Sequence, residues 1–285
     1  MITYPNCKIN LGLRIIGKRP DGYHNLETIF YPVYGLHDTL EIKRQDHFQF
    51  IQTGHIVTGA EEDNLVVRCY RLMQELYPQI GSVCIRLHKN IPFGAGLGGG
   101  SSDAAHTAIM LNEIFQLGLN RQQLMDIVTP LGADCPFFIQ NQPCYAGGIG
   151  DELQPIPALL DNLRIVILKP ETGISTREAY AGIHLHPEAE GNLLQALRQG
   201  EKALLKAAIN DFEETVFPLH IELNTIKQML LQAGAKYAAM SGSGSAIYGL
   251  FEDDSEGRTN PNLRMFNKDF APMVIFNDTL GKREP

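Results

Sequence analysis

Residues 94–103 read Gly-Ala-Gly-Leu-Gly-Gly-Gly-Ser-Ser-Asp, and five of the first seven are glycine. The alternating apolar residues of 83–87 predict a strand just before this stretch. After it, Ala104, Ala108 and Leu111 recur at helical spacing, and the preceding serines and aspartate are typical of a helix start. The sequence therefore predicts a strand, a glycine-rich loop and a helix that the serines cap.

A glycine-rich loop before a helix can hold a phosphate group. Residues without Cβ let successive backbone N–H groups approach an anion, and the helix N-terminus adds a partial positive charge. A loop that merely caps the helix is the alternative, but this many glycines cost conformational entropy without adding packing. We therefore expect the loop to bind phosphate.

Three other phosphate-site patterns fit this loop less well. The P-loop pattern is absent, since neither Gly17-Lys18 nor Gly281-Lys282 is followed by Ser or Thr. Gly94-x-Gly96-x-x-Gly99 matches the dinucleotide fingerprint, but residues 113–129 continue as helix and turn where an acidic residue should end a second strand. The protein-kinase motifs His-Arg-Asp and Asp-Phe-Gly are also missing. A dinucleotide-dependent oxidoreductase is thus a weaker alternative.

Composition indicates the cellular compartment of the protein and excludes some classes of partner. The 285 residues carry a net charge of −8, the wrong sign for a chain held mainly by nucleic acid or an anionic membrane. The five cysteines show no Cys-x-x-Cys spacing, which favours a reducing cytoplasm. No secretory leader and no apolar run of 18 residues is present, so we expect a soluble protein that is not secreted. The sequence does not determine the oligomeric state, and we expect a monomer or a homodimer that acts on a small molecule.

The rest of the chain predicts a mixed α and β protein with a mainly antiparallel sheet. Alternation over 8–16 predicts a half-buried strand with Lys8 and Asn10 on one face. The glycine- and proline-rich stretch 147–157 predicts a boundary between domains 1–152 and 153–285. Further patterns predict strands at 40–50, 163–168, 237–240 and 246–251, and helices at 64–77, 121–128, 175–181, 192–208 and 221–233.

Five motifs along the chain together resemble those of the galactokinase, homoserine kinase, mevalonate kinase and phosphomevalonate kinase superfamily. The glycine loop alone indicates only this superfamily. The lysine, Tyr-His and Gly-Ala-Asp motifs resemble the branch that acts on 4-diphosphocytidyl-2-C-methyl-D-erythritol. The motifs are Cys7-Lys8-Ile9-Asn10-Leu11, Asp21-Gly22-Tyr23-His24, residues 96–105, Gly132-Ala133-Asp134-Cys135-Pro136-Phe137-Phe138 and Ser241-Gly242-Ser243-Gly244-Ser245.

The resemblance implies a fold and an activity. The fold is α+β in two domains, an N-terminal ATP-binding domain like ribosomal protein S5 domain 2 and a ferredoxin-like C-terminal domain that completes the substrate pocket. The activity is transfer of the γ-phosphoryl group of ATP, with Mg²⁺, to the 2-hydroxyl of the cytidyl substrate, a step of the non-mevalonate route to isoprenoid precursors. A superfamily kinase for mevalonate, homoserine or a sugar is the nearest alternative, and a nucleotide sensor without catalysis is a further one.

The resemblance also assigns residues. Asp134 matches the catalytic base and a substrate-binding position, and Lys8 matches its charged partner. The other expected substrate contacts are Asn10, Tyr23, His24, Thr176 and Tyr180. Tyr23 and His24 match positions that hold the cytosine ring, and Thr176 and Tyr180 match positions that the C-terminal domain contributes to the same pocket. The expected ATP contacts are Gly94, Ala95, Gly96, Leu97, Gly98, Gly99, Gly100, Ser101 and Ser102, with Asn64 and Lys89 near the adenosine.

Two features set this chain apart from the family pattern. Cys7 and Cys135 stand where alanine and valine are usual, and we interpret both as buried packing residues. The helix glutamate that binds magnesium in distant members has no match here, so the metal ligands are unknown. Taken singly, Asp134 reads as a turn or helix cap and Lys8 as a solvated edge charge. Only their joint occurrence at family spacing favours catalysis.

Overall fold

The computed structural model describes residues 1–55, 59–183, 185, 192–252 and 274–281. It is mixed α and β, with three four-stranded sheets of order β1-β4-β6-β5, β2-β3-β7-β8 and β10-β11-β9-β12. The chain forms two compact units, one of residues 1–8, 36–93 and 98–142, the other of residues 9–35, 94–97 and 143–285. Each unit is built from segments that alternate along the chain. The expected domains 1–152 and 153–285 are instead consecutive stretches, and their boundary stays a prediction.

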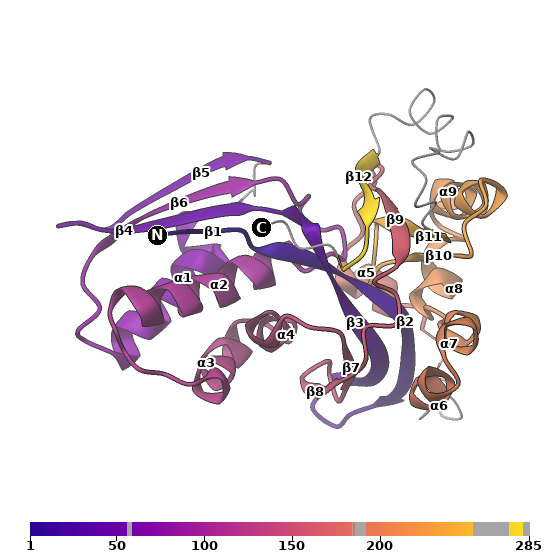
Figure 1. The fold of residues 1–285 in the computed structure, drawn as a ribbon, viewed down its shortest axis with the longest axis horizontal. Helices are drawn as coiled ribbons and strands as arrows, with labels where there is room; N and C mark the ends of the chain where they lie inside the picture. The colour runs from indigo at the N-terminus through magenta and orange to yellow at the C-terminus, as the bar shows by residue number, and fades with distance from the viewer. Residues whose placement is uncertain (56–58, 184, 186–191, 253–273, 282–285) are drawn as a thin grey trace. The chain divides into compact units, whose positions relative to one another are not determined.

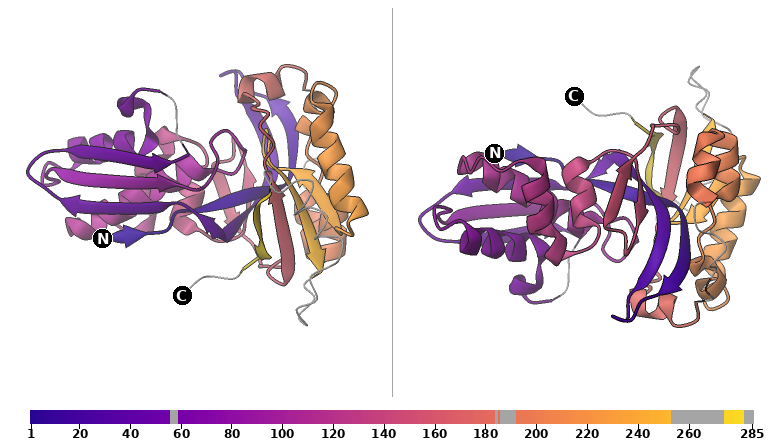
Figure 2. Two further views of the ribbon diagram at one scale, coloured as in Figure 1. Left: turned by 90° about the horizontal axis from the view of Figure 1, so that it is seen from above. Right: turned by 90° about the horizontal axis from the view of Figure 1, so that it is seen from below.

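The first unit holds a sheet covered by helices. Its strands are β1 (Ile2–Thr3), β4 (Thr39–Arg44), β5 (Gln49–Gly54) and β6 (Val83–Lys89). Its helices are α1 (Leu65–Leu76), α2 (Gly99–Ile114), α3 (Arg121–Val128), α4 (Cys135–Gln140) and the short 3-10 turns η1 (Glu61–Asp63) and η2 (Thr129–Leu131). Helices α1 and α2 lie against one face of the sheet, as Figures 1 and 2 show.

Helix α2 lies in the core of this unit because its buried side chains are small. Ala104, Ala105 and Ala108 have no exposed surface, and the helix packs against α1 and α4. Such short side chains let neighbouring helices approach closely. The glycine loop at the start of α2 is therefore fixed to a rigid element.

The second unit has two sheets and its own helices. Strands β2 (Asn6–Lys18) and β3 (His24–His37) pair with the hairpin β7 (Cys144–Gly147) and β8 (Glu152–Pro155). The other sheet contains β9 (Leu163–Leu168), β10 (Tyr237–Met240), β11 (Ile247–Glu252) and β12 (Val274–Thr279). The helices are α5 (Thr176–Tyr180), α6 (Asn192–Arg198), α7 (Glu201–Ala207), α8 (Phe212–Val216) and α9 (Ile221–Gln232).

Several expected elements differ from the observed ones. The expected strand at 40–50 is two strands, β4 and β5, which both pair with β6, β4 antiparallel and β5 parallel. The expected helix at 192–208 is broken between α6 and α7 at Gly200, whose φ of +95° suits glycine. The stretch 147–157 carries the β7–β8 turn rather than only a linker. Pairing partners decide the two strand differences, whereas Gly200 is a local signal that the sequence reading missed.

Strand β2 is buried on both faces, not half-buried as expected. Residues 6–13 are all buried, including the polar Lys8 and Asn10. Polar side chains tolerate such burial only where they find partners. Their partners define the candidate site.

Candidate active site

In the first unit, the ammonium of Lys8 pairs with the carboxylate of Asp134. Lys8 Nζ lies 3.3 Å from Asp134 Oδ2, and the two side chains are 4% and 32% exposed. Lys8 is thus no solvated edge charge. Asp134 occupies the N-cap position of α4, but its side chain makes no cap hydrogen bond there. A partly exposed carboxylate beside a buried cation is available to a bound substrate.

The glycine loop meets this ion pair at Gly98. A Cβ on Gly98 would lie 3.1 Å from Lys8 Cε and 3.0 Å from the ring of Phe138, which belongs to α4 just after Asp134. Gly98 also has a φ of +71°, which favours glycine. Glycine at this position therefore lets the loop, the lysine and the aspartate come together.

Helix α2 begins at Gly99, two residues before the expected start, and Gly98 in the left-handed region is its cap. The expectation that Ser101 and Ser102 cap the helix is therefore wrong. The first helical hydrogen bond runs from Ser102 N–H to Gly98 C=O at 2.9 Å. The N–H groups of Gly99, Gly100 and Ser101, the first three residues of α2, consequently have no acceptor within the helix.

The start of the loop, residues 94–97, belongs to the second unit and contacts the serine-rich motif there. Ser241 Oγ donates to Gly96 C=O at 2.9 Å, and Ala246 N–H donates to Ala95 C=O at 3.1 Å. A Cβ on Gly96 would lie 1.9 Å from the carbonyl oxygen of Ser241, so only glycine fits. The serine motif, whose role the sequence left open, therefore holds the loop.

Asn10 lies beside the same motif. Its N–H donates to Ser241 Oγ at 3.2 Å and its amide donates to Thr28 Oγ1 at 3.1 Å. The side chain is buried, and a Cβ on Gly242 would lie 3.2 Å from Asn10 Oδ1. The contacts of Asn10 thus fix the strand next to the serine motif.

The second unit brings together two of the residues expected to hold cytosine, His24 and Tyr180. The rings of His24 and Tyr180 stack with centroids 4.8 Å apart, and Tyr180 packs edge-on against Phe212, also at 4.8 Å. Thr176 Oγ1 lies 3.5 Å from Ser243 Oγ. Tyr23 is 61% exposed. Burial, helped by the charge of Lys18, lowers the pKa of His24 below its ordinary value, which favours the neutral ring.

The two residues expected near adenosine have other partners. Asn64 caps α1, since its side-chain oxygen accepts from Val66 N–H at 3.0 Å, and its amide donates to Gln52 Oε1 at 3.0 Å. Lys89 Nζ is buried between the carboxylates of Asp38 and Asp103. Sequence reasoning missed Asp38, because a lone aspartate before a strand carries no local signal.

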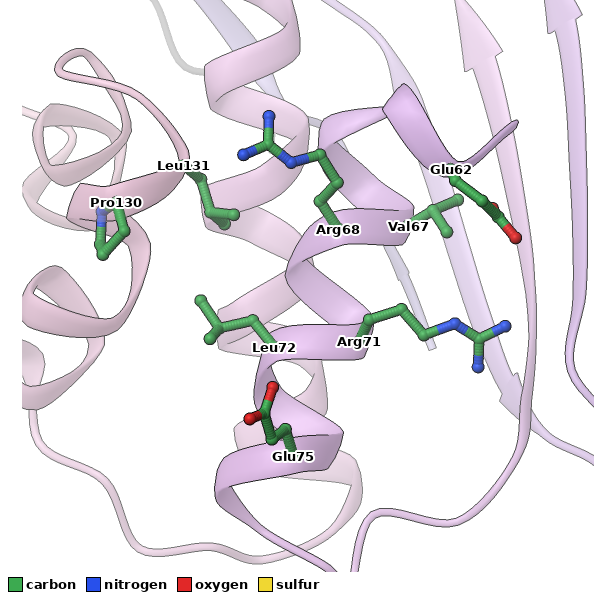
Figure 3. A pocket seen from close by; sticks show the side chains of 8 residues that line it. All are labelled: Glu62, Val67, Arg68, Arg71, Leu72, Glu75, Pro130 and Leu131. Carbon is green, nitrogen blue, oxygen red and sulfur yellow. The ribbon is translucent and has the colours of Figure 1, made fainter. Parts of the chain in front are cut away.

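A surface hollow of about 430 Å³ in the first unit contains none of the expected site residues. Arg68, Arg71 and Leu72 of α1 line it opposite Pro130 and Leu131 (Figure 3). It is open and lies along the outer side of α1, whereas Lys8, Asp134 and Gly98 converge elsewhere in the same unit. We therefore place the candidate active site at the ion pair.

Two family models match the chain. The family described as GHMP kinases N terminal domain matches residues 64–142, and GHMP kinases C terminal matches residues 193–259. The chain belongs to the GHMP kinases, and it is a kinase, an enzyme that transfers a phosphoryl group from ATP. The oxidoreductase and the sensor are thereby excluded.

Individual relatives show to which branch of the GHMP kinases the chain belongs. A 4-diphosphocytidyl-2-C-methyl-D-erythritol kinase of Bacteroides thetaiotaomicron is 50% identical over 258 residues, which are 89% of this chain and 93% of the relative. A crystal structure of a 4-(cytidine 5'-diphospho)-2C-methyl-D-erythritol kinase has a TM-score of 0.79 at 31% identity, covering 99% of this chain and 100% of the other. The chain therefore belongs, within the GHMP kinases, to the 4-diphosphocytidyl-2-C-methyl-D-erythritol kinase family.

A more distant structure confirms the α+β fold. Methanococcus jannaschii mevalonate kinase has a TM-score of 0.71 at 16% identity, covering 99% of this chain and 98% of the other. Among the described residues, no helix is both long enough and apolar enough to cross a membrane.

Proposed function

We propose that this chain transfers the γ-phosphoryl group of ATP to the 2-hydroxyl of 4-diphosphocytidyl-2-C-methyl-D-erythritol, in the non-mevalonate route to isoprenoid precursors. Relatives that span most of the chain carry the name of that kinase. The observation that carries the mechanism is the Lys8–Asp134 pair at 3.3 Å beside the glycine loop. The five cysteines are all buried and none forms a disulfide, which supports a reducing cytoplasm as the compartment.

In the proposed reaction, Asp134 accepts the proton of the acceptor hydroxyl. The hydroxyl oxygen forms a bond to the γ-phosphorus while the bond from that phosphorus to the bridging oxygen breaks, and its electron pair leaves with ADP. Phosphoryl transfer needs mainly positioning and charge stabilisation. Lys8 holds the Asp134 carboxylate in place, and its ammonium stabilises the negative charge that develops on the transferred group.

The loop from Gly94 to Ser102 is proposed to hold the ATP phosphates. The N–H groups of Gly99, Gly100 and Ser101 precede the first hydrogen bond of α2, so they lack helical acceptors. Anions bind such helix N-termini because of the free donors and the helix dipole. Asn64 and Lys89 are proposed to serve the adenosine end of this site.

Magnesium is proposed to arrive with ATP. The described residues contain no group of three His, Cys, Asp or Glu side chains that could hold a metal. Mg²⁺ characteristically uses one or two protein oxygens together with substrate phosphates and water. The Ser101 hydroxyl, whose Oγ would lie 3.7 Å from a Cβ on Gly132, fits that donor set. Bound there, the ion would neutralise phosphate charge.

The acceptor is proposed to bind through its cytosine. His24 and Tyr180 already stack in parallel, so a pyrimidine ring can extend that stack. A neutral His24 can exchange hydrogen bonds with the pyrimidine edge. Asn10, Tyr23 and Thr176 complete the proposed substrate contacts.

A coupled assay of ADP release tests the function. We would compare the cytidyl substrate, its uridyl analogue and free methylerythritol phosphate, with mevalonate and homoserine as further acceptors. The cytidyl substrate should have by far the largest kcat/KM, because uridine reverses the donor and acceptor at the 4-position of the pyrimidine. Equal turnover of the first three would show that the pocket does not read cytosine. Turnover of mevalonate or homoserine alone would show that the chain phosphorylates the substrate of another GHMP kinase.

A further inference from the structure

The proposed reaction uses Asn10 but not its neighbour Thr28. Asn10 lies on β2 and Thr28 on β3, and these strands are adjacent in one sheet, as Figures 1 and 2 show. The amide of Asn10 donates from Nδ2 to Thr28 Oγ1 at 3.1 Å. Thr28 is 0% and Asn10 3% exposed, so water hardly competes for this hydrogen bond.

The single hydrogen of the Thr28 hydroxyl is already used. Thr28 Oγ1 donates to the backbone carbonyl of Gly12, and a carbonyl can only accept. The hydroxyl oxygen can therefore serve Asn10 only as an acceptor. Because two acceptors facing each other would leave both unpaired, the amide of Asn10 must turn its NH2 group, and not its oxygen, towards Thr28.

The acceptor of the Thr28 hydroxyl is itself held in place. Leu13, which follows Gly12, donates from its N–H to Ile209 C=O at 2.8 Å. The C=O of Leu13 accepts from Asp211 N–H, also at 2.8 Å. The backbone after Gly12 is thus bound on both sides, so the direction of the Thr28 hydroxyl is fixed by the fold of the second unit.

The other side of the Asn10 amide faces the serine motif. A Cβ on Gly242 would lie 3.2 Å from Asn10 Oδ1 and 3.3 Å from the carbonyl oxygen of Gly96. The backbone of Asn10 is bound at the same place, because its N–H donates to Ser241 Oγ at 3.2 Å and its C=O accepts from the Tyr248 hydroxyl at 2.8 Å. The backbone is therefore fixed, and the side-chain amide needs one further contact to take a single orientation.

We propose that Thr28 is a positioning residue for the acceptor substrate, which orients the amide of Asn10 and does not touch the substrate itself. The proposal rests on Asn10 as a substrate contact in the proposed function. An amide offers a donor on one side and an acceptor on the other, so a rotated amide would exchange the groups that it offers to the substrate. Phosphoryl transfer depends mainly on positioning, so such a change costs rate.

The test is a double-mutant cycle. Thr28→Val keeps the shape of the side chain and removes the hydroxyl, and Asn10→Ala removes the amide. Thr28→Val should lower kcat/KM for the cytidyl substrate about tenfold or more, while MgATP affinity in calorimetry stays within about twofold of wild type. In the Asn10→Ala background the same change should cost less than about twofold, because no amide is left to orient. Thr28→Ser keeps the hydroxyl and should stay within about threefold of wild type.

The controls separate this role from a structural one and from the proposed function. If Thr28 only supports the strand through Gly12, Thr28→Val would lose the same factor with and without the Asn10 amide, and that result would overturn the proposal. Unchanged kcat/KM in Thr28→Val or in Asn10→Ala would overturn it as well. Thr225→Val is the matched control, since the Thr225 hydroxyl on α9 of the same unit donates to Ile221 C=O at 3.1 Å, and it should leave kcat/KM unchanged. Turnover of the cytidyl substrate by the wild type tests the proposed function separately.

A second pair of variants covers the case in which Thr28→Val does not fold. Thr28→Ser and Thr28→Ala differ from each other only in the hydroxyl. The proposal expects kcat/KM about tenfold or more higher in Thr28→Ser, and a difference below about twofold when both are combined with Asn10→Ala. Equal kcat/KM in the two variants, or a difference that persists without the amide, would contradict it.

Discussion

Replacing Asp134 by Asn tests the proposed base most directly. Asparagine keeps the shape of the side chain but cannot accept a proton. Because the side chain of Asp134 makes no cap hydrogen bond to α4, the helix loses no hydrogen bond of that kind. Removing a general base costs roughly a hundred to ten thousand fold in rate, or about 3–5.5 kcal/mol in the activation barrier. We expect kcat to fall by that factor while the affinities for ATP and the cytidyl substrate change little.

The effect of Asp134→Asn on stability is smaller than its effect on rate. At 3.3 Å the gross Coulomb attraction between Lys8 and Asp134 is about 5 kcal/mol for an effective dielectric constant of 20. The carboxylate is 32% exposed, so solvent screens much of it, and the amide oxygen of asparagine can still accept from Lys8. We expect a net loss of about 1–2 kcal/mol and a Tm lower by roughly 2–8 °C.

The assay is ADP release at saturating ATP and cytidyl substrate, together with a thermal melt. Asp126→Asn is the matched control, since it makes the same change on the exposed side of α3 in the same unit. Near-normal kcat in Asp134→Asn would refute the role as base. A rise in KM with unchanged kcat would instead show that Asp134 only binds the acceptor.

Three further predictions concern the loop and the cytosine pocket. Gly98→Ala should weaken ATP binding and reduce kcat by tenfold or more, whereas Gly118→Ala, with a similar φ of +72° and no atom within 4 Å of the new Cβ, should lower only Tm. Equal kinetics in the two variants would count against a close approach of phosphate to the loop. Tyr180→Leu should weaken binding of the cytidyl substrate by about ten to a hundred fold with ATP affinity unchanged, as calorimetry can show, because a stacked base is worth roughly 1–3 kcal/mol. The pKa of His24 is lowered, so the folded protein binds fewer protons there than the unfolded chain, and stability falls as pH drops below about 6.5. The KM of the cytidyl substrate should rise in the same range, and a His24→Asn variant that keeps this rise would disprove the assignment.

Local sequence patterns predicted most elements correctly. Helices α1, α3, α5 and α9 and strands β6, β9, β10 and β11 lie where hydrophobic spacing places them, because each needs only one apolar face and a local start or stop signal. The same reasoning missed β7, β8, β12 and α8, which are short and depend on neighbours elsewhere in the chain.

The sequence alone determined the family and the residue types of the site. The glycine loop, the lysine strand and the Gly-Ala-Asp motif carry chemistry that can be recognised without coordinates, because a glycine-rich loop before a helix start is a common phosphate site. Their order along the chain was enough to indicate a GHMP kinase, which the comparisons confirmed.

Only the tertiary structure decided what each polar residue touches. Lys8 lies on a strand that looked half-exposed, yet it is buried because Asp134, more than a hundred residues later, supplies the opposite charge. Lys89 gave no sign in the sequence that it lies between Asp38 and Asp103. A buried charge is tolerated only with partners, and partners distant in sequence meet only when the chain folds. Local pattern therefore fixes which groups are available, and packing decides which of them act together.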